Sequence, residues 1–125
     1  MKKIITSANA PAAIGPYSQA VEINGMLFIS GQLPINPSKG KIEYEEIALQ
    51  TEQVFANIAA ILDEAGYSFN DVIKSTVFLS DISHFTGMNE VYKKYYQIDC
   101  PARSAFAVRD LPLGALVEIE TIAAK

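Results

Sequence analysis

The chain has few of the residues that metal and disulfide chemistry require. Its 125 residues include one cysteine, Cys100, one histidine, His84, and no tryptophan. A lone cysteine excludes an intramolecular disulfide and is typical of a reducing compartment. With one histidine, one cysteine and no repeated Asp/Glu spacing, no zinc or two-metal ligand set can be assembled, so we expect no metal. We interpret His84 as a residue just before a helix and Cys100 as a small buried or incidental thiol.

Long apolar runs and basic clusters are also missing. The opening segment Met1–Ile5 carries two lysines but leads into no sustained apolar stretch, and no segment is long enough to span a membrane. Ten basic residues stand against 14 acidic ones, which gives a net charge of -4 and a pI of about 4.9. Nucleic-acid binding needs clustered basic residues, and Lys93-Lys94 is the only basic pair beyond the N-terminus. We therefore expect a cytoplasmic protein that binds neither membranes nor nucleic acids.

Familiar nucleotide and hydrolase motifs are absent as well. No Gly-x-Gly-x-x-Gly or Walker pattern is present, so nothing supports a nucleotide cofactor. A catalytic triad around His84 lacks the Gly-x-Ser-x-Gly elbow. What the chain does have is apolar content, with 50% hydrophobic and 19% charged residues. This length and composition predict one folded domain over residues 1–125, with an apolar excess that favours burial in an oligomer.

Periodicity predicts the elements of the first half. Residues 2–6 form a short strand, and residues 19–23 and 26–30 form a hairpin, because Asn24-Gly25 suits a two-residue turn with positive φ at both positions. Apolar residues recur at helical spacing from about residue 44 to residue 65, and Gly66 follows as a left-handed helix cap.

The second half predicts a strand over residues 72–79, a helix over 85–97 and strands near 103–108 and 115–123. The resulting order, β-ββ-α-β-α-β-β, indicates an α+β fold in which both helices cover one face of a mixed sheet. The other face also carries Ile, Val, Phe and Leu, and we expect another subunit to cover it.

Arg103 is the most informative residue, because it is one of only two arginines and begins a strand after Pro101. A guanidinium is a permanently charged fork that matches a carboxylate or phosphate. The flanking residues Ala102, Ala105 and Phe106 are predicted to be buried, and a charge among them needs a partner. The alternative is a surface arginine paired with a nearby acid, which contributes about 0–1 kcal/mol.

The last strand offers two carboxylates. The two-residue period of a strand places Glu118 and Glu120 on one face, about 6–7 Å apart, where each raises the proton affinity of the other if water is excluded. A solvated edge-strand face explains them equally well, and spacing alone does not say which is catalytic. Tyr17, in a stiff Gly-Pro loop, suits either a pocket or the core, and Asn89 suits a helix cap better than a pocket.

Four motifs in this order resemble the RidA/YjgF family of reactive-intermediate deaminases, and the resemblance covers essentially the whole chain. The motifs are Ala10-Pro11-Ala12-Ala13-Ile14-Gly15-Pro16-Tyr17-Ser18-Gln19-Ala20, Ile29-Ser30-Gly31-Gln32-Leu33-Pro34, Pro101-Ala102-Arg103-Ser104 and Val117-Glu118-Ile119-Glu120.

The resemblance implies a chorismate-mutase-like fold, a homotrimeric barrel with ligand clefts between subunits, no cofactor, and hydrolysis of short 2-imino acids to 2-oxo acids and ammonia. The imino acids in question arise as enamines from pyridoxal-phosphate dehydratases. Arg103 matches the arginine that holds the substrate carboxylate, and Glu118 matches the glutamate that positions or activates water. The positions that match the cleft lining are Tyr17, Ser30, Gly31 and Asn89.

One position departs from several family members, which carry a cysteine where this chain has Ala105. A thiol-dependent mechanism is therefore excluded here, and Cys100 lies before the motif and does not replace it. Two alternatives to the deaminase remain: a regulatory protein that binds small 2-oxo acids without turnover, and an endoribonuclease or translation inhibitor, which the acidic charge balance disfavours.

Overall fold

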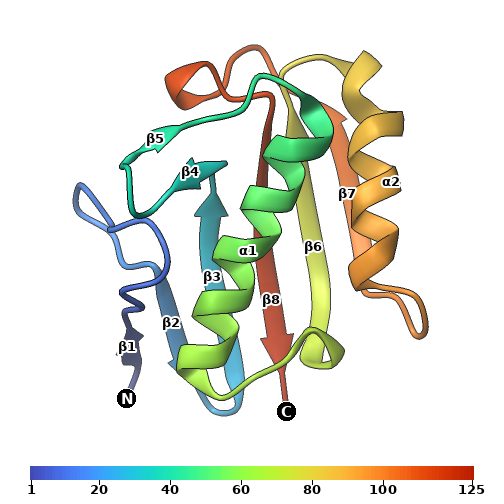
Figure 1. The fold of residues 1–125 in the computed structure, drawn as a ribbon. Helices are drawn as coiled ribbons and strands as arrows, with labels where there is room; N and C mark the ends of the chain where they lie inside the picture. The colour runs from blue at the N-terminus through green and yellow to red at the C-terminus, as the bar shows by residue number, and fades with distance from the viewer.

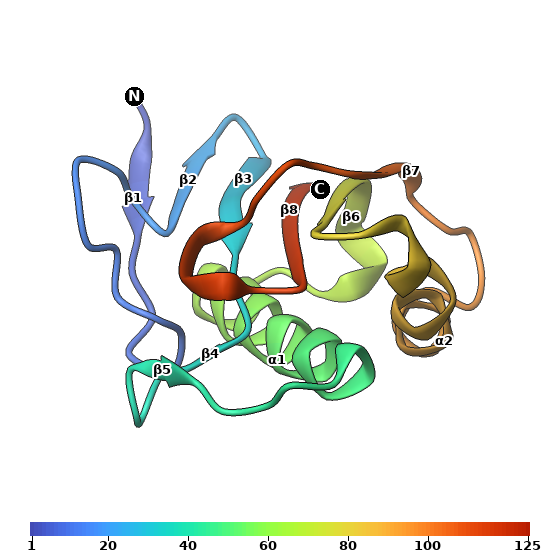
Figure 2. The same ribbon diagram turned by 90° about the horizontal axis from the view of Figure 1, so that it is seen from above.

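Two helices pack on one face of a six-stranded mixed sheet (Figures 1 and 2). The computed structural model describes residues 1–125. Across the sheet the strand order is β1-β2-β3-β8-β6-β7, in which only β6 and β7 pair in parallel. The strands are β1 Lys3–Ile5, β2 Ala20–Ile23, β3 Met26–Gln32, β4 Ile35–Asn36, β5 Lys41–Ile42, β6 Val72–Leu79, β7 Ala102–Ala107 and β8 Val117–Ala124. The helices are α1 Ile47–Ala65 and α2 Phe85–Tyr95.

The predicted hairpin and the predicted helix cap are confirmed. Asn24 and Gly25 have φ values of 51° and 76°, and they connect β2 to β3 as the turn chemistry requires. Gly66 has a φ of 80°, and its amide donates to the carbonyl of Asp63 to end α1. The strand predicted over residues 72–79 is β6, with the same bounds.

The two helices enclose the core against the sheet. In α1 the residues that repeat at helical spacing are buried, among them Val54, Ile58 and Ile61. Phe55 lies fully buried between the helices, where its ring stacks on that of Tyr95 at 4.3 Å. The expected two-layer arrangement is therefore confirmed, whereas α2 is two residues shorter than predicted and α1 begins three residues later.

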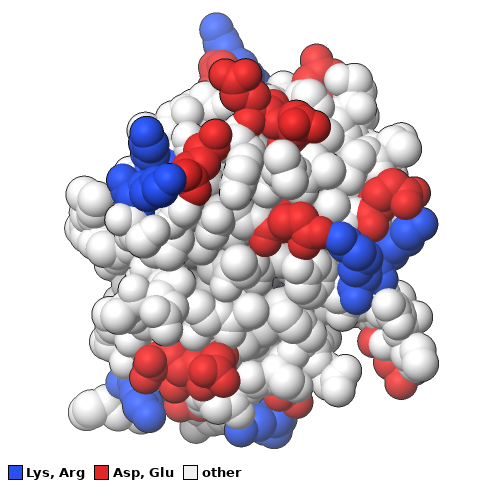
Figure 3. Space-filling view, in the orientation of Figure 1, with Lys and Arg blue, Asp and Glu red and all other residues white.

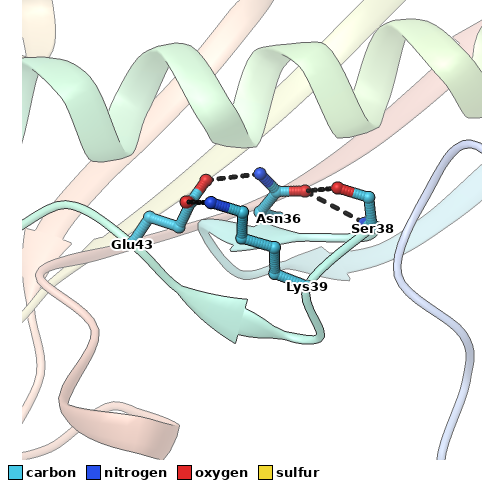
Figure 4. A network of polar contacts seen from close by, with 4 residues as sticks. All are labelled: Asn36, Ser38, Lys39 and Glu43. Atoms are coloured by element: carbon cyan, nitrogen blue, oxygen red, sulfur yellow. Dashed lines mark hydrogen bonds and ion pairs between the residues drawn. The ribbon is translucent and has the colours of Figure 1, made fainter.

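A small hairpin between β3 and α1 is absent from the elements that the sequence predicts. Strands β4 and β5 have two residues each, which is too short for a two-residue period to be visible. Asn36 binds the Ser38 amide and hydroxyl through its carbonyl oxygen and Glu43 through its amide, while Lys39 pairs with Glu43 at 2.6 Å (Figure 4). This polar network fixes the turn between β4 and β5.

Strand β7 is an edge strand of the sheet, and this position corrects one expectation. We predicted burial for the residues around Arg103, but Ala102 and Phe106 are exposed and Ala105 is only half-buried. An edge strand has one neighbour instead of two, so its side chains lose the cover that a central strand would give them. The apolar character of β7 therefore has to be explained in another way.

The face of the sheet away from the helices is apolar and open. Register across the strands places Ile4, Phe28 and Phe106 on this face, and their side chains are 50%, 43% and 45% exposed. The Phe106 ring meets only that of Phe78, edge to face at 5.5 Å. A single chain thus leaves an aromatic and aliphatic surface uncovered, as the sequence pattern predicts.

Candidate active site

Arg103 lies on the helix side of β7 and is held by one face of α2. Its Nη1 donates to Asn89 Oδ1 at 2.7 Å. The guanidinium carbon lies 4.6 Å from the centre of the Tyr92 ring and 5.4 Å from that of Phe85. Positions 85, 89 and 92 follow the helical spacing of four and three, so consecutive turns of α2 present all three side chains to β7.

This arrangement leaves most of the guanidinium free. The arginine side chain has five N–H donors, and a single bond to Asn89 is the only hydrogen bond that the Arg103 side chain makes within the chain. No acid pairs with Arg103, whereas the other arginine, Arg109, is almost fully exposed and lies 3.9 Å from Asp110. Arg103 is therefore a surface arginine, as one interpretation held, but the acid expected to pair with it is absent.

Asn89 is not a helix cap. It lies in the second turn of α2, and the residue at the cap position is His84, as expected for a residue just before a helix. The carbonyl oxygen of Asn89 instead fixes one end of the Arg103 guanidinium. We expected a cap because Asn89 is close to the helix start predicted at residue 85. The sequence does not show which face of this helix meets β7.

Glu118 lies in a cleft on the opposite face of the sheet from Arg103. This open cleft of about 670 Å³ brings together four residues singled out from the sequence, with Glu120 beside them. Its lining residues are Ala12, Ile14, Tyr17, Ser30, Gly31, Leu33, Ile35, Pro112, Leu113, Glu118 and Glu120. Three segments far apart in the sequence therefore meet around one carboxylate.

Gly31 lets the Glu118 carboxylate approach the backbone of β3. A Cβ at position 31 would stand 2.1 Å from Glu118 Oε2 and 3.0 Å from its carboxyl carbon, far inside van der Waals contact. The φ of Gly31 is not positive, so this glycine is needed for space and not for backbone conformation. The register of β3 on β8 shifts between Ile29 and Gln32, which marks an irregularity at the same point.

The environment of Glu118 favours its protonated form. Burial, and then the negative charge of Glu120, raise the pKa of the Glu118 carboxyl above its usual 4.5. Glu118 and Glu120 share a face of β8, as predicted, but β8 is an interior strand. The alternative of a solvated edge strand is therefore wrong for Glu118, which is half-buried, while Glu120 is exposed.

Gln19 holds the loop that carries Tyr17, and the sequence analysis missed this role. The buried Gln19 amide donates to the carbonyls of Ser7 and Pro11 at 3.1 and 2.8 Å, and its oxygen accepts from the Ser7 amide. Ser30 Oγ donates to the Ser18 carbonyl at 2.7 Å and ties the loop to β3. The signal available in the sequence was an amide side chain at the start of the predicted strand over residues 19–23.

The sequence-predicted residues thus form two groups that a single chain keeps apart. Ser75 on β6 is the register partner of Arg103, and Phe78 on the same strand is the partner of Glu118. Positions 75 and 78 point to opposite faces because side chains alternate along a strand. Arg103 with Asn89 therefore faces the helices, and Glu118 with Tyr17, Ser30 and Gly31 faces the open side of the sheet.

Further observations limit the kinds of binding site that this chain can form. No group of three His, Cys, Asp or Glu side chains is placed to hold a metal ion. On the helix-covered side of the molecule, Lys and Arg side chains lie in separate small groups near acidic side chains and form no continuous basic stripe (Figure 3). Neither helix combines the length and the hydropathy that crossing a lipid bilayer requires. Cys100 is exposed and donates weakly to the Tyr96 carbonyl, so of the two expectations, a buried or an incidental thiol, the buried one is wrong.

Relatives with assigned names match the chain along its whole length. A RutC family protein of Pyrococcus horikoshii is 54% identical over 125 residues, covering 100% of this chain and 99% of the relative. The Lactococcus lactis protein named as the regulator AldR is 51% identical over 97% and 96%. The 2-iminobutanoate/2-iminopropanoate deaminase of Bos taurus is 49% identical over 98% of this chain and 90% of that protein.

Solved structures match the fold closely. A Thermotoga maritima protein named as an endoribonuclease has a TM-score of 0.97 at 46% identity, covering 100% of this chain and 98% of the other. The E. coli protein TdcF, crystallised with bound serine, has a TM-score of 0.93 at 42% identity and covers 98% of both chains. Residues 7–125 match the family described as endoribonuclease L-PSP. The chain therefore belongs to the RidA/YjgF/L-PSP family, whose motifs its sequence carries.

Proposed function

We propose that this protein hydrolyses short-chain 2-imino acids, the tautomers of 2-aminoacrylate and 2-aminocrotonate, to 2-oxo acids and ammonia. The observation that carries the proposal is the unpaired Arg103 guanidinium, held by Asn89 and two aromatic rings with most of its donors free. A bidentate carboxylate on this fork gains about 1.5–3 kcal/mol. Family members with 46–49% identity that are named 2-iminobutanoate/2-iminopropanoate deaminases support this choice of substrate.

The chemistry asks little of the protein. A protonated imine carbon is already electrophilic, so water attacks it once a base accepts a proton from that water. The base returns this proton to the nitrogen of the resulting amino alcohol, the C–N bond breaks and ammonia leaves. The hydroxyl proton passes to the departing ammonia, so an iminium group plus water gives a carbonyl group plus ammonium. Glu118 is the proposed base, since burial and the Glu120 charge raise its pKa and make its carboxylate a stronger proton acceptor than an ordinary glutamate. A well-placed base supplies roughly 10²–10⁴-fold. Nothing in this sequence of steps requires a cofactor.

The two halves of the proposed site belong to different copies of the chain. Arg103 and Glu118 lie on opposite faces of one sheet, and the open face near Glu118 is apolar and uncovered. In the homotrimeric barrel that we propose, the β7 edge of one copy brings Arg103 and Asn89 toward the Glu118 cleft of the next. Tyr17, Ser30 and Gly31 would then line the cleft on the Glu118 side.

A coupled assay tests the proposal directly. A dehydratase generates 2-aminocrotonate or 2-aminoacrylate, and release of the 2-oxo acid and ammonia is followed with and without this protein. We expect acceleration by the wild type and none by Arg103→Ala, with its fold checked by circular dichroism. Glu118→Gln should lower the rate at least about tenfold and Glu120→Gln much less, because only Glu118 is half-buried against Gly31. Full activity of Arg103→Ala would refute the assignment.

A second candidate is a regulatory protein that binds small 2-oxo acids without turnover. The Arg103 platform suits any small carboxylate, and the relative named as the regulator AldR favours this reading. Saturable binding of 2-oxobutanoate without accelerated imine hydrolysis would select it. The family is also described as endoribonuclease L-PSP. RNA cleavage by the purified protein that is abolished in Arg103→Ala would support an endoribonuclease.

A further inference from the structure

Tyr92 connects the Arg103 guanidinium to the interior of the protein. Its ring face lies 4.6 Å from the guanidinium carbon, closer than the Phe85 ring at 5.4 Å. Unlike the exposed arginine, Tyr92 is only 6% exposed. A cation on an aromatic face gains more when the ring is immobile and shielded from water. The orientation of the arginine therefore depends on what holds this ring.

The hydroxyl end of Tyr92 belongs to a buried polar cluster, which we call the hydroxyl cluster. Its members are Ser75, Tyr92, Tyr96 and Thr121, and all four hydroxyl oxygens are buried without a hydrogen-bond partner in the chain. Ser75 stands beside Arg103 on one neighbouring strand and beside Thr121 on the other. The Tyr96 ring lies 4.8 Å from the Tyr92 ring, about one helical turn further along the chain.

The Ser75 hydroxyl affects both tyrosine phenols. Burial raises the pKa of both Tyr92 and Tyr96, and the neighbouring Ser75 hydroxyl partly offsets the rise in each case. Arg103 also lowers the pKa of Tyr92. The hydroxyl cluster thus extends inward from the guanidinium across β6 to β8.

Four buried hydroxyls without hydrogen-bond partners destabilise a folded protein. An unsatisfied buried polar group is unfavourable, and each such group in a native structure calls for an explanation. A buried water molecule makes about three hydrogen bonds to polar groups of this kind. Hydroxyls both donate and accept, so they suit a shared water whichever way its hydrogens point.

We propose that Tyr92 is a positioning residue for Arg103. Its ring holds the guanidinium in the orientation that receives a carboxylate. A water molecule enclosed by the hydroxyl cluster holds the far end of that ring. The effect on catalysis rests on the proposed function, whereas the effect on Arg103 itself does not.

Tyr95 on the same helix provides a matched control. Its hydroxyl donates to Glu52 at 2.7 Å and its ring stacks on Phe55, so it is a partly buried tyrosine away from the arginine. Tyr95→Phe also removes one tyrosine hydroxyl from α2, but it leaves the Arg103 platform intact. Tyr92→Phe keeps the ring and removes only its hydroxyl, and Tyr92→Leu removes both.

The first test observes Arg103 in the absence of any ligand. Since Arg103 and Arg109 are the only arginines, the ¹⁵N–¹H spectrum of their Nε–H groups contains two signals, and the exposed Arg109 is an internal reference. We expect the Arg103 signal to be shifted by the aromatic rings and to move toward that of Arg109 in Tyr92→Leu. Tyr92→Phe should move it part of the way and Tyr95→Phe should leave it in place. An Arg103 signal that Tyr92→Leu does not move would overturn the proposal.

The second test measures ligand affinity. We expect Tyr92→Leu to raise the Kd for 2-oxobutanoate and the KM for the imine about tenfold with little change in kcat, the pattern of lost ground-state binding. In an Arg103→Lys background, which keeps the charge but not the planar fork, the same substitution should add less than about threefold. An equal effect in both backgrounds would mean that Tyr92 does not act through the arginine.

These readouts separate the positioning role from the proposed function. Loss of 2-oxobutanoate affinity in Tyr92→Leu, in a protein that never accelerates imine hydrolysis, would leave the positioning role intact and remove the deaminase. Normal affinity, KM and Arg103 signal in an active Tyr92→Leu protein would leave the deaminase intact and remove the positioning role.

A crystal structure at high resolution tests the water. It should show one ordered water within hydrogen-bond distance of Ser75 Oγ and of the Tyr92 hydroxyl, and the same water should be lost or displaced in Tyr92→Phe. Direct bonds among the hydroxyls, with no enclosed water, would overturn that part of the proposal.

Discussion

At the scale of single residues, Gly31 decides where the Glu118 carboxylate can lie. Its missing side chain leaves the space that Glu118 Oε2 occupies. We predict that Gly31→Ala keeps the fold, because the clash falls on the flexible end of a side chain, but rotates the carboxylate away. The value of kcat/KM should fall about tenfold or more, as for a displaced general base.

The Glu118→Ala background controls for indirect effects of Gly31→Ala. With the carboxylate gone, the added methyl group meets no acid, and the residual activity should not fall further. An equal loss of activity in both backgrounds would show that Gly31 acts on the site by another route.

The carboxylate pair also predicts a pH dependence. Because the negative charge of Glu120 helps to raise the Glu118 pKa, Glu120→Gln should lower that pKa while leaving the contribution of burial. A base works only when deprotonated, so activity falls as the pH drops through its pKa. The acid limb of the kcat/KM profile should therefore lie at lower pH in Glu120→Gln than in the wild type, and an unchanged limb would contradict the pairing.

At the scale of elements, the loop that carries Tyr17 has no regular structure and depends on Gln19. Four hydrogen bonds join the Gln19 amide to Ser7, Ala10 and Pro11. We predict that Gln19→Leu, which is similar in size but cannot form these bonds, lowers the free energy of unfolding by about 1–3 kcal/mol. Denaturant titration measures the loss, and kcat/KM should fall with it because Tyr17 loses its support.

Gln97→Leu is the control for this prediction. Gln97 also carries a side-chain amide, but it lies exposed just after the end of α2. Its replacement should change unfolding and activity little. If the Gln19 and Gln97 variants behaved alike, the loop would not depend on the Gln19 amide.

Elements with a strong local pattern were predictable from the sequence, and short ones were not. The β-branched and aromatic residues of Val72–Leu79 and the turn chemistry of Asn24-Gly25 act between neighbours in the chain, so both elements were predicted correctly. The β4–β5 hairpin has too few residues for any period. The burial predicted around Arg103 was wrong because β7 is an edge strand. Only the pairing between segments far apart in the chain decides which strand lies at the edge.

The candidate site shows the same limit. Residue type and motif order pointed to Arg103 and Glu118, but they did not reveal that the two residues lie on opposite faces of one sheet. That fact depends on the register of β6 with both β7 and β8. Likewise, the role of Asn89 depends on which face of α2 meets β7, so the sequence favoured a cap where the structure shows a contact to arginine.

At the scale of the whole molecule, the open sheet face and the divided site lead to one explanation. An aromatic and aliphatic surface of this kind, carrying Ile4, Phe28 and Phe106 with about half of each side chain exposed, is characteristic of an interface. If copies of the chain meet through it, each copy supplies what its neighbour lacks. Assembly and activity should then be lost together.

Phe106→Asp tests this link, because burying an unpaired carboxylate in an interface is strongly unfavourable. We predict that the wild type sediments at about three times the 13.6 kDa of one chain, and that Phe106→Asp sediments as a folded 13.6 kDa monomer without imine hydrolysis. Ile82→Asp, which places the same charge on a residue 60% exposed in the turn before α2, should remain assembled and active. A fully active Phe106→Asp monomer would show that one chain holds a complete site, and the division of Arg103 and Glu118 between copies would then be wrong.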